Sequence, residues 1–235
     1  MAAEGTNGNL CVENASLAEL QQALAEGRTT ASALTRAYLA RIEAYDRAGP
    51  NLNSVREINP DALAIAASFD RIKPNPKQPL AGLPILVKDN IATADMQHTT
   101  AGSLALAEAR AKRDAALVAR LRAAGAVILG KANLTEFANI LAIDMPAGYS
   151  SLGGQVKNPY VPGLDDKGVP VVSPGGSSSG SAVAVAAGIA AAAFGPAAAA
   201  PLGAYGVLVL LAGSVAAIIA RRRPAVDGTT SESAV

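Results

Sequence analysis

The chain has 235 residues, which is enough for one sizeable domain or two small ones. A net charge of +1 gives no reason to expect a nucleic-acid partner. A single cysteine, Cys11, excludes an internal disulfide framework, and a single histidine, His98, excludes any metal site or proton relay built on two histidines.

The N-terminal part predicts helices after a polar lead-in over residues 1–14. Ser16 and Glu19 form a capping-box pattern ahead of leucines at helical spacing, so a first helix is expected there. Thr29 or Thr30 is placed to cap a second helix. No basic segment leads into an apolar one at this end, so no secretory signal is predicted and a cytoplasmic location is the default.

The middle of the chain predicts alternating helices and short buried strands. A third helix is expected with Pro60 at its first helical position. Leu83–Val87 reads as a strand, a helix starts near Asp114 and ends at Gly125, and Ala126–Leu129 reads as a second strand followed by a turn. Strand, helix and strand joined by short connections predict an α/β layer with a mainly parallel sheet.

Two motifs carry chemistry. In GLPILVKDNI (82–91) an apolar strand runs directly into Lys88 and Asp89. In SPGGSSSGSAVAVA (173–186) glycines and serines precede a run of small apolar residues that reads as a buried helix. Burial disfavours the charged form of lysine and can make Lys88 a base. The alternatives are a structural lysine that neutralises Asp89 and a plain Gly/Ser-rich loop.

Together these motifs resemble the amidase signature family, whose members hydrolyse amides with a Ser–Ser–Lys triad. Gly82–Asn90 match its G-x-P-x-x-V-K-D-N motif, and Gly175–Ser181 match its G-G-S-S-[GS]-G-S motif. Further motifs recur in the family's order, among them GKANLTEFA (130–138), and the resemblance runs from about Ser16 to Gly195. It implies an α/β fold with a mixed sheet covered by helices, of which this chain carries the N-terminal half.

The resemblance also implies roles for individual residues. Lys88 would be the base, and Ser177 would be the bridging serine that follows a cis peptide bond from Gly176. Ser178 would support them through hydrogen bonds, although capping of the following helix is an alternative for at least one of Ser178, Ser179 and Ser181. No metal or cofactor is expected.

The resemblance breaks where the nucleophile is expected. In the family the nucleophilic serine lies 24 residues after the bridging serine and ends a T-E-T-D-G-S type loop. In this chain that position is Pro201, which has neither a hydroxyl nor an N–H group, at the end of the sequence PAAAAP. We therefore expect Lys88 and Ser177 to be present, the nucleophile and oxyanion loop to be missing, and amide hydrolysis to be negligible.

The C-terminal tail is unlike the family. Leu202 to Ala220 is almost entirely apolar and is followed by three arginines, Arg221 to Arg223. The stretch is just long enough to span a bilayer as a helix, which would make the chain membrane-anchored. The alternatives are a product of splicing or a shifted reading frame, and a buried helix. The expected segments are thus a lead-in (1–14), a partial amidase domain (15–195), an apolar tail (196–223) and a disordered end (224–235).

Two functional hypotheses remain open, with a structural one beside them. The first is an amidase-type hydrolase that converts a small carboxylic amide to an acid and ammonia or an amine through an acyl-serine, inactive in this chain. The second is a tail-anchored membrane protein that uses a non-catalytic amidase-like half as a binding module. The third is a chain that does not fold stably, because sheet edges and core faces are left uncovered. Nothing in the sequence predicts the oligomeric state.

Overall fold

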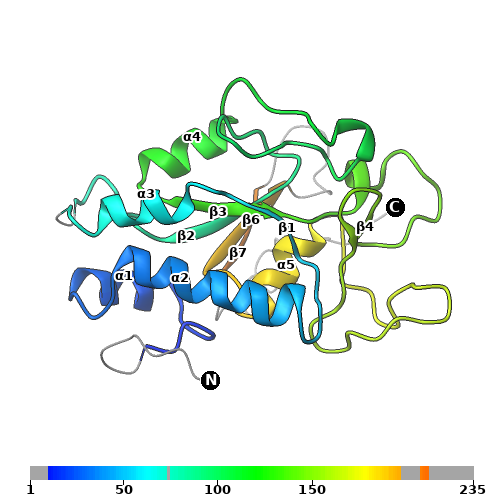
Figure 1. The fold of residues 1–235 in the computed structure, drawn as a ribbon, viewed down its shortest axis with the longest axis horizontal. Coiled ribbons are helices and arrows are strands. Elements are labelled where there is room, and N and C mark those ends of the chain that lie inside the picture. Colours follow the sequence, from blue (N-terminus) through cyan, green and yellow to red (C-terminus); the bar gives the residue numbers. More distant parts are fainter. Residues whose placement is uncertain (1–9, 73–74, 197–206, 212–235) are drawn as a thin grey trace, which may run out of the picture.

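A computed structural model describes residues 10–72, 75–196 and 207–211 of the chain, and the side chains up to residue 195 (Figure 1). Its centre is a five-stranded sheet in the order β1-β3-β2-β6-β7. The strands β3, β2 and β6 are parallel, whereas β1 and β7 run antiparallel at the two edges. Their bounds are β1 Val55–Ile58, β2 Pro84–Lys88, β3 Val127–Ala132, β6 Ala192–Pro196 and β7 Val207–Leu211.

Helices lie on both faces of this sheet, as Figure 1 shows, with α4 on one side and α1, α2 and α5 on the other. This arrangement confirms the predicted α/β class with a mixed sheet covered by helices. The bounds are α1 Leu17–Ala25, α2 Ala31–Arg41, α3 Ala62–Phe69, α4 Ala116–Ala123 and α5 Ser179–Ala186. The π-helical turn η1 Ile42–Arg47 continues α2, and two 3₁₀ turns, η2 Leu104–Leu106 and η3 Glu136–Asn139, lie in loops. A small hairpin pairs β4 Tyr149–Ser150 with β5 Gly154–Gln155.

The predicted helix starts are largely confirmed. Ser16 and Glu19 form the complete capping box of α1, and the Thr30 hydroxyl accepts a hydrogen bond from the Ala33 N–H at the start of α2. The prediction for α3 was wrong in register, because the helix begins at Ala62 and Pro60 precedes it. The Asn59 side chain accepts a hydrogen bond from the backbone N–H two residues later, so a turn occupies the position predicted as helical.

The strand β3 is longer than the sequence predicted. Gly130 to Ala132 continue the strand instead of forming a turn, and Lys131 is fully buried within it. The edge strand β1 was not predicted, because two of its four residues, Arg56 and Glu57, are charged. Both differences have one cause, which is that charged side chains at this end of the sheet find partners from distant parts of the chain. Arg56 pairs with Asp89, and Lys131 donates to the Ile91 carbonyl oxygen and the Thr99 hydroxyl.

The core consists of two hydrophobic clusters separated by the sheet. Along β2, Leu86 belongs to the cluster that includes α2 and α5, whereas Ile85 and Val87 belong to the cluster that includes α4. Alternate residues of a strand point to opposite faces, so this pattern fixes the direction of each β2 side chain. Lys88, one residue beyond Val87, consequently lies on the α5 face.

Two contacts hold α5 against the rest of the fold. The guanidinium of Arg41, at the end of α2, donates to the carbonyl oxygens of Ala187 (3.0 Å) and Gly188 (2.7 Å) just beyond the C-terminus of α5. Near the N-terminus of α5, the Gly180 N–H donates to the Asn133 carbonyl oxygen at 3.1 Å. The helix that follows the serine motif is therefore fixed at both ends by distant parts of the chain.

The predicted C-terminal helix is not what the described residues show. Val207–Leu211, which lie inside the predicted helix, form β7 and pair with β6 along its whole length. A short apolar run with valines, bounded by Gly206 and Gly213, fits a buried strand as well as a helix, and periodicity alone cannot separate them. The rest of Leu202 to Ala220 lies outside the described residues, as do residues 1–9, Pro201, Arg221 to Arg223 and 224–235. Among the described helices, none has both the length and the apolar character that crossing a membrane requires.

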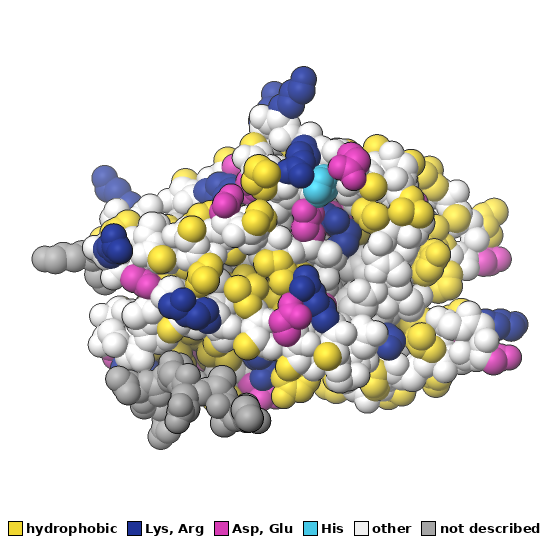
Figure 2. Space-filling model, viewed as in Figure 1, with side chains coloured by type: hydrophobic (Ala, Val, Ile, Leu, Met, Phe, Trp, Pro, Cys, Tyr) yellow, Lys and Arg dark blue, Asp and Glu magenta, His cyan; other side chains and the backbone are white. Residues whose placement is uncertain are grey.

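The surface mixes charges of both signs. On the face shown in Figure 2, basic and acidic side chains are interspersed among apolar ones. Among the described residues, the two most exposed large apolar side chains are in the loop after η3, where Ile143 and Ile140 are 94% and 80% exposed.

Candidate active site

The structure brings Lys88 and Ser177 together. Lys88 is the last residue of β2 and Ser177 lies in the turn before α5, 89 positions later in the chain, yet Lys88 Nζ is hydrogen-bonded to Ser177 Oγ at 2.7 Å. Lys88 is fully buried and Ser177 is 5% exposed. Burial lowers the pKa of Lys88 to about 8, because the ammonium form loses its hydration. The pair can therefore hold a neutral amine beside a hydroxyl from about pH 8 upward, instead of from about pH 10.5.

The backbone around Ser177 has the unusual geometry that the resemblance implied. The peptide bond from Gly176 to Ser177 is cis, and Gly175 has a φ of 75°. The backbone N–H of Thr135 donates to the Ser177 carbonyl oxygen at 3.1 Å. The Ser179 hydroxyl donates to the Gly175 carbonyl oxygen at 2.6 Å, which closes the serine turn on itself.

Ser178 lies on the β6 side of the pair. A methyl group at Gly195 of β6 would lie 2.5 Å from Ser178 Oγ and 3.3 Å from Lys88 Cδ, so only glycine leaves room for both side chains here. Ser178 is at the N-cap position of α5, but its side chain makes no capping hydrogen bond. The hydroxyl of Ser181 is buried and has no hydrogen-bond partner among the described residues. Helix capping does not account for Ser178.

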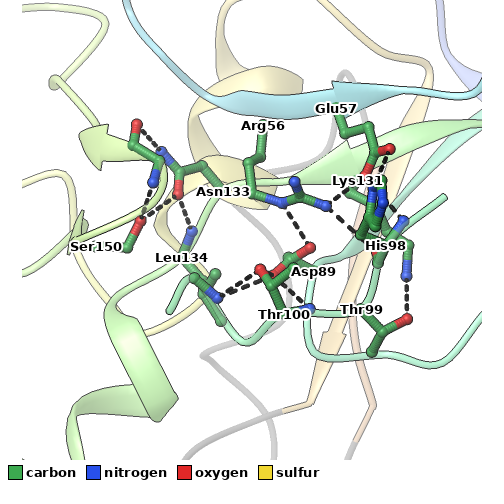
Figure 3. Close-up of polar contacts among 12 residues, drawn as sticks. Arg56, Glu57, Asp89, His98, Thr99, Thr100, Lys131, Asn133, Leu134 and Ser150 are labelled. Atoms are coloured by element: carbon green, nitrogen blue, oxygen red, sulfur yellow. Dashed lines mark hydrogen bonds and ion pairs between the residues drawn. The ribbon is translucent and has the colours of Figure 1, made fainter. Parts of the chain in front are cut away.

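The contacts of Asp89 test the alternative that Lys88 is a structural lysine neutralising Asp89. Its carboxylate pairs with the guanidinium of Arg56 at 2.6 Å, and within the described residues it forms no ion pair with Lys88. Figure 3 shows Arg56 reaching Asp89 beside Thr100, with a second buried lysine, Lys131, on the same side. The interpretation of Lys88 as the ion-pair partner of Asp89 is wrong, because Arg56 forms that ion pair.

Sequence reasoning missed three residues that build this site. Thr135 holds the Ser177 backbone, Gly195 makes room for Ser178, and Arg56 pairs with Asp89. Thr135 lies in GKANLTEFA (130–138), a motif that the resemblance already included, so its signal was present. Arg56 gave no signal, because nothing in the local sequence places it opposite Asp89.

The described residues contain no cluster of metal ligands. Within 10–72, 75–196 and 207–211, no three His, Cys, Asp or Glu side chains lie close enough together to hold an ion. What the arrangement of Lys88 and Ser177 can do is move a proton between a hydroxyl and a buried amine.

Comparisons with known proteins agree with this geometry. The sequence profile of the Amidase family matches residues 33–196. A protein of Schizosaccharomyces pombe named among the amidases is 41% identical over 189 residues, which are 80% of this chain and 30% of that protein. A protein of Arabidopsis thaliana, also named among the amidases, is 43% identical over 188 residues, which are 78% of this chain and 35% of that protein.

Solved structures of amidases are also similar to this chain. The native peptide amidase of Stenotrophomonas maltophilia superposes with a TM-score of 0.69 at 49% identity, covering 77% of this chain and 36% of the enzyme. An amidase family protein from Bacillus anthracis superposes with a TM-score of 0.71 at 43% identity, covering 79% and 36%. This chain thus spans about a third of the length of the relatives it matches. On the match of sequence profile, relatives and fold, the chain belongs to the amidase family.

Proposed function

We propose that this chain carries the lysine and the bridging serine of an amidase site but does not itself turn over amides. The observation that supports the proposal is the buried contact of 2.7 Å between Lys88 Nζ and Ser177 Oγ. In the complete family site a third residue, the nucleophilic serine, attacks the amide carbon. The corresponding position here is Pro201, which has no hydroxyl with which to attack.

The two residues present would act as a proton relay. Neutral Lys88 would accept the proton of Ser177, and Ser177 would in turn take the proton of an attacking hydroxyl next to it. When the tetrahedral intermediate collapses, the same route run backwards would protonate the departing amine, which leaves poorly as an anion. The substrate class is a small carboxylic amide, in line with the peptide amidase among the solved relatives.

Without the nucleophile, this relay has nothing to deprotonate. Removing the nucleophile from a triad removes most of the rate acceleration, because the groups of a triad act as a unit. We therefore expect ammonia release no faster than the uncatalysed rate from acetamide, benzamide and a C-terminal peptide amide. We also expect no labelling by a fluorophosphonate, which reacts with activated serines.

The experiment compares the wild-type chain with Ser177→Ala, and a complete amidase serves as the positive control. Turnover by the wild-type chain at the level of the complete enzyme would refute the proposal. If that turnover disappeared in Ser177→Ala, the chain would hydrolyse amides through Ser177 despite Pro201, and the expectation of an inactive site would be wrong.

A further inference from the structure

The carboxylate of Asp89, the residue after Lys88, is held by four donors. Arg56 Nε donates to Oδ1 at 2.6 Å. The Thr100 hydroxyl (2.6 Å), the Thr100 N–H (3.2 Å) and the Gly102 N–H (2.9 Å) donate to Oδ2. The Asp89 backbone N–H also donates to the Ala132 carbonyl oxygen at 3.0 Å, which extends the β2–β3 pairing past Lys88. Side chain and backbone of Asp89 are therefore both fixed (Figure 3).

Asp89 and Lys88 lie on opposite faces of the sheet. Lys88 reaches Ser177 on the α5 face, whereas Asp89 reaches Arg56 on the other. Lys131 is the register partner of Val87, and its ammonium donates to the Ile91 carbonyl oxygen at 2.6 Å and to Thr99 Oγ1 at 3.2 Å. One end of the sheet thus contains two buried lysines, and only Lys131 shares a face with the acidic groups.

The charged groups near Lys88 gather on the far face. On the face of Lys88, α5 and β6 contain no ionisable side chain, whereas α2, which also packs against β2, carries Arg36, Tyr38 and Arg41. Arg56 also pairs with Glu57 at 2.6 Å, and Glu57 accepts from the His98 backbone N–H at 3.0 Å. Ionisable groups of the far face include Arg56, Glu57, Asp89, Asp95, His98, Asp114, Arg122 and Lys131.

The charge of Arg56 opposes the electrostatic effect of the Asp89 carboxylate on the Lys88 amine. A buried carboxylate one residue away attracts a proton to the Lys88 amine, because an opposite charge nearby stabilises the ammonium form. The guanidinium of Arg56 cancels this attraction, since its charge is opposite to that of Asp89 and it contacts Asp89 directly. Its side chain is 9% exposed, so solvent screens the pair little.

We propose that Arg56 is a positioning residue for Lys88. It holds the Asp89 carboxylate on the far face and neutralises it, so that this carboxylate does not keep a proton on Lys88, the proton acceptor for Ser177. This inference rests on the proposed relay and adds to it a residue from a different strand, β1, that does not touch the reacting atoms.

The test measures the pKa of Lys88 in the intact chain and needs no activity. The lysine side-chain carbon and proton shifts of uniformly ¹³C-labelled protein are followed against pH by NMR, and Lys88→Met and Lys131→Met spectra assign the two buried lysines. In Arg56→Met the Lys88 pKa should rise by about one unit, the order expected when a nearby unit charge is removed at an effective dielectric constant of about 20. In Asp89→Asn it should fall, and in the double variant it should return toward the wild-type value.

Opposite shifts from the two single variants, cancelling in the double, are a signature that mere disruption of the fold would not give. Arg56→Lys keeps the charge and should leave the Lys88 pKa near wild type, as should Arg113→Met, which removes an exposed arginine elsewhere. If Arg56→Met does not fold, Asp89→Asn decides, because an unchanged Lys88 pKa in that variant overturns the proposal.

Failure of this inference is distinguishable from failure of the proposed function. If wild-type Lys88 titrates near its ordinary value of about 10.4, the relay role itself is refuted and the inference falls with it. If wild-type Lys88 titrates near 8 and Arg56→Met leaves it there, only the role of Arg56 is refuted.

Discussion

Replacing Gly180 with alanine should strongly destabilise this fold, even though alanine is the better helix former. A methyl group at Gly180 would lie 2.3 Å from the Ser54 carbonyl oxygen and 2.5 and 2.6 Å from the Asn133 carbonyl oxygen and nitrogen. All three are backbone atoms beside β1 and β3, and no side-chain rotation can move them away. The helix α5 would have to shift, which would break the hydrogen bond from the Gly180 N–H to Asn133.

The magnitude follows from these contacts. Overpacking costs about 1–3 kcal/mol, and because these contacts are with backbone atoms we take the upper part of that range, about 2–3 kcal/mol. The lost hydrogen bond costs about 1 kcal/mol more, and the gain in helix propensity offsets about 1 kcal/mol. The free energy of unfolding should therefore fall by about 2–3 kcal/mol. For a chain of this size the midpoint of thermal unfolding should drop by roughly 5–10 °C.

Circular dichroism followed during heating measures this change directly. The matched control is Gly163→Ala, since a methyl group there has its nearest neighbour at 3.8 Å, an ordinary contact. The control should melt within about 2 °C of wild type. If Gly180→Ala melts at the wild-type temperature or above it, the close approach of α5 to β1 and β3 is wrong.

Two further predictions concern buried charges. Burial lowers the pKa of both Lys88 and Lys131 to about 8, so between about pH 8 and 10.5 the unfolded chain binds more protons than the folded one. The free energy of unfolding should therefore rise with pH in that window, by up to about 1.4 kcal/mol per pH unit for each lysine. Urea unfolding at about pH 8 and 9.5 should show this slope reduced by about half in Lys88→Met, and an unchanged slope would contradict the prediction. Asp46 is 1% exposed and accepts hydrogen bonds from the Ser54 N–H (2.6 Å), the Ser54 hydroxyl (2.5 Å) and the Val55 N–H (2.9 Å). Asp46→Ala should therefore lower the free energy of unfolding, measured in urea, by about 3 kcal/mol. The control Asp61→Ala, at an exposed position, should change it by less than about 0.5 kcal/mol.

Features set by neighbouring residues could be predicted from the sequence. The capping box of Ser16 and Glu19 was readable because its donors and acceptors lie three residues apart. The apolar run that ends at Lys88 was readable as a strand because it is buried on both faces. The serine turn was recognised through a family motif, which already carries long-range information.

Features set by distant residues could not be predicted. β1 has charged residues where a strand pattern needs apolar ones. They are partly buried, and their partners Asp89 and His98 come from elsewhere in the chain. Lys131 was taken as a turn residue for the same reason, since its partners lie in another loop. The position of β7 on β6 depends on sheet pairing, which the apolar sequence of 207–211 does not encode by itself.

The hydrogen bonds from Arg41 to the C-terminal end of α5 have a consequence for how the chain folds. The carbonyl groups that it caps lie 146 and 147 positions later in the sequence, and they belong to the helix that positions the serine turn. This helix has eight residues, which is too short to be stable alone in water. The serine turn should therefore become ordered only after the first two helices have docked, and contacts of such long sequence separation make folding slow.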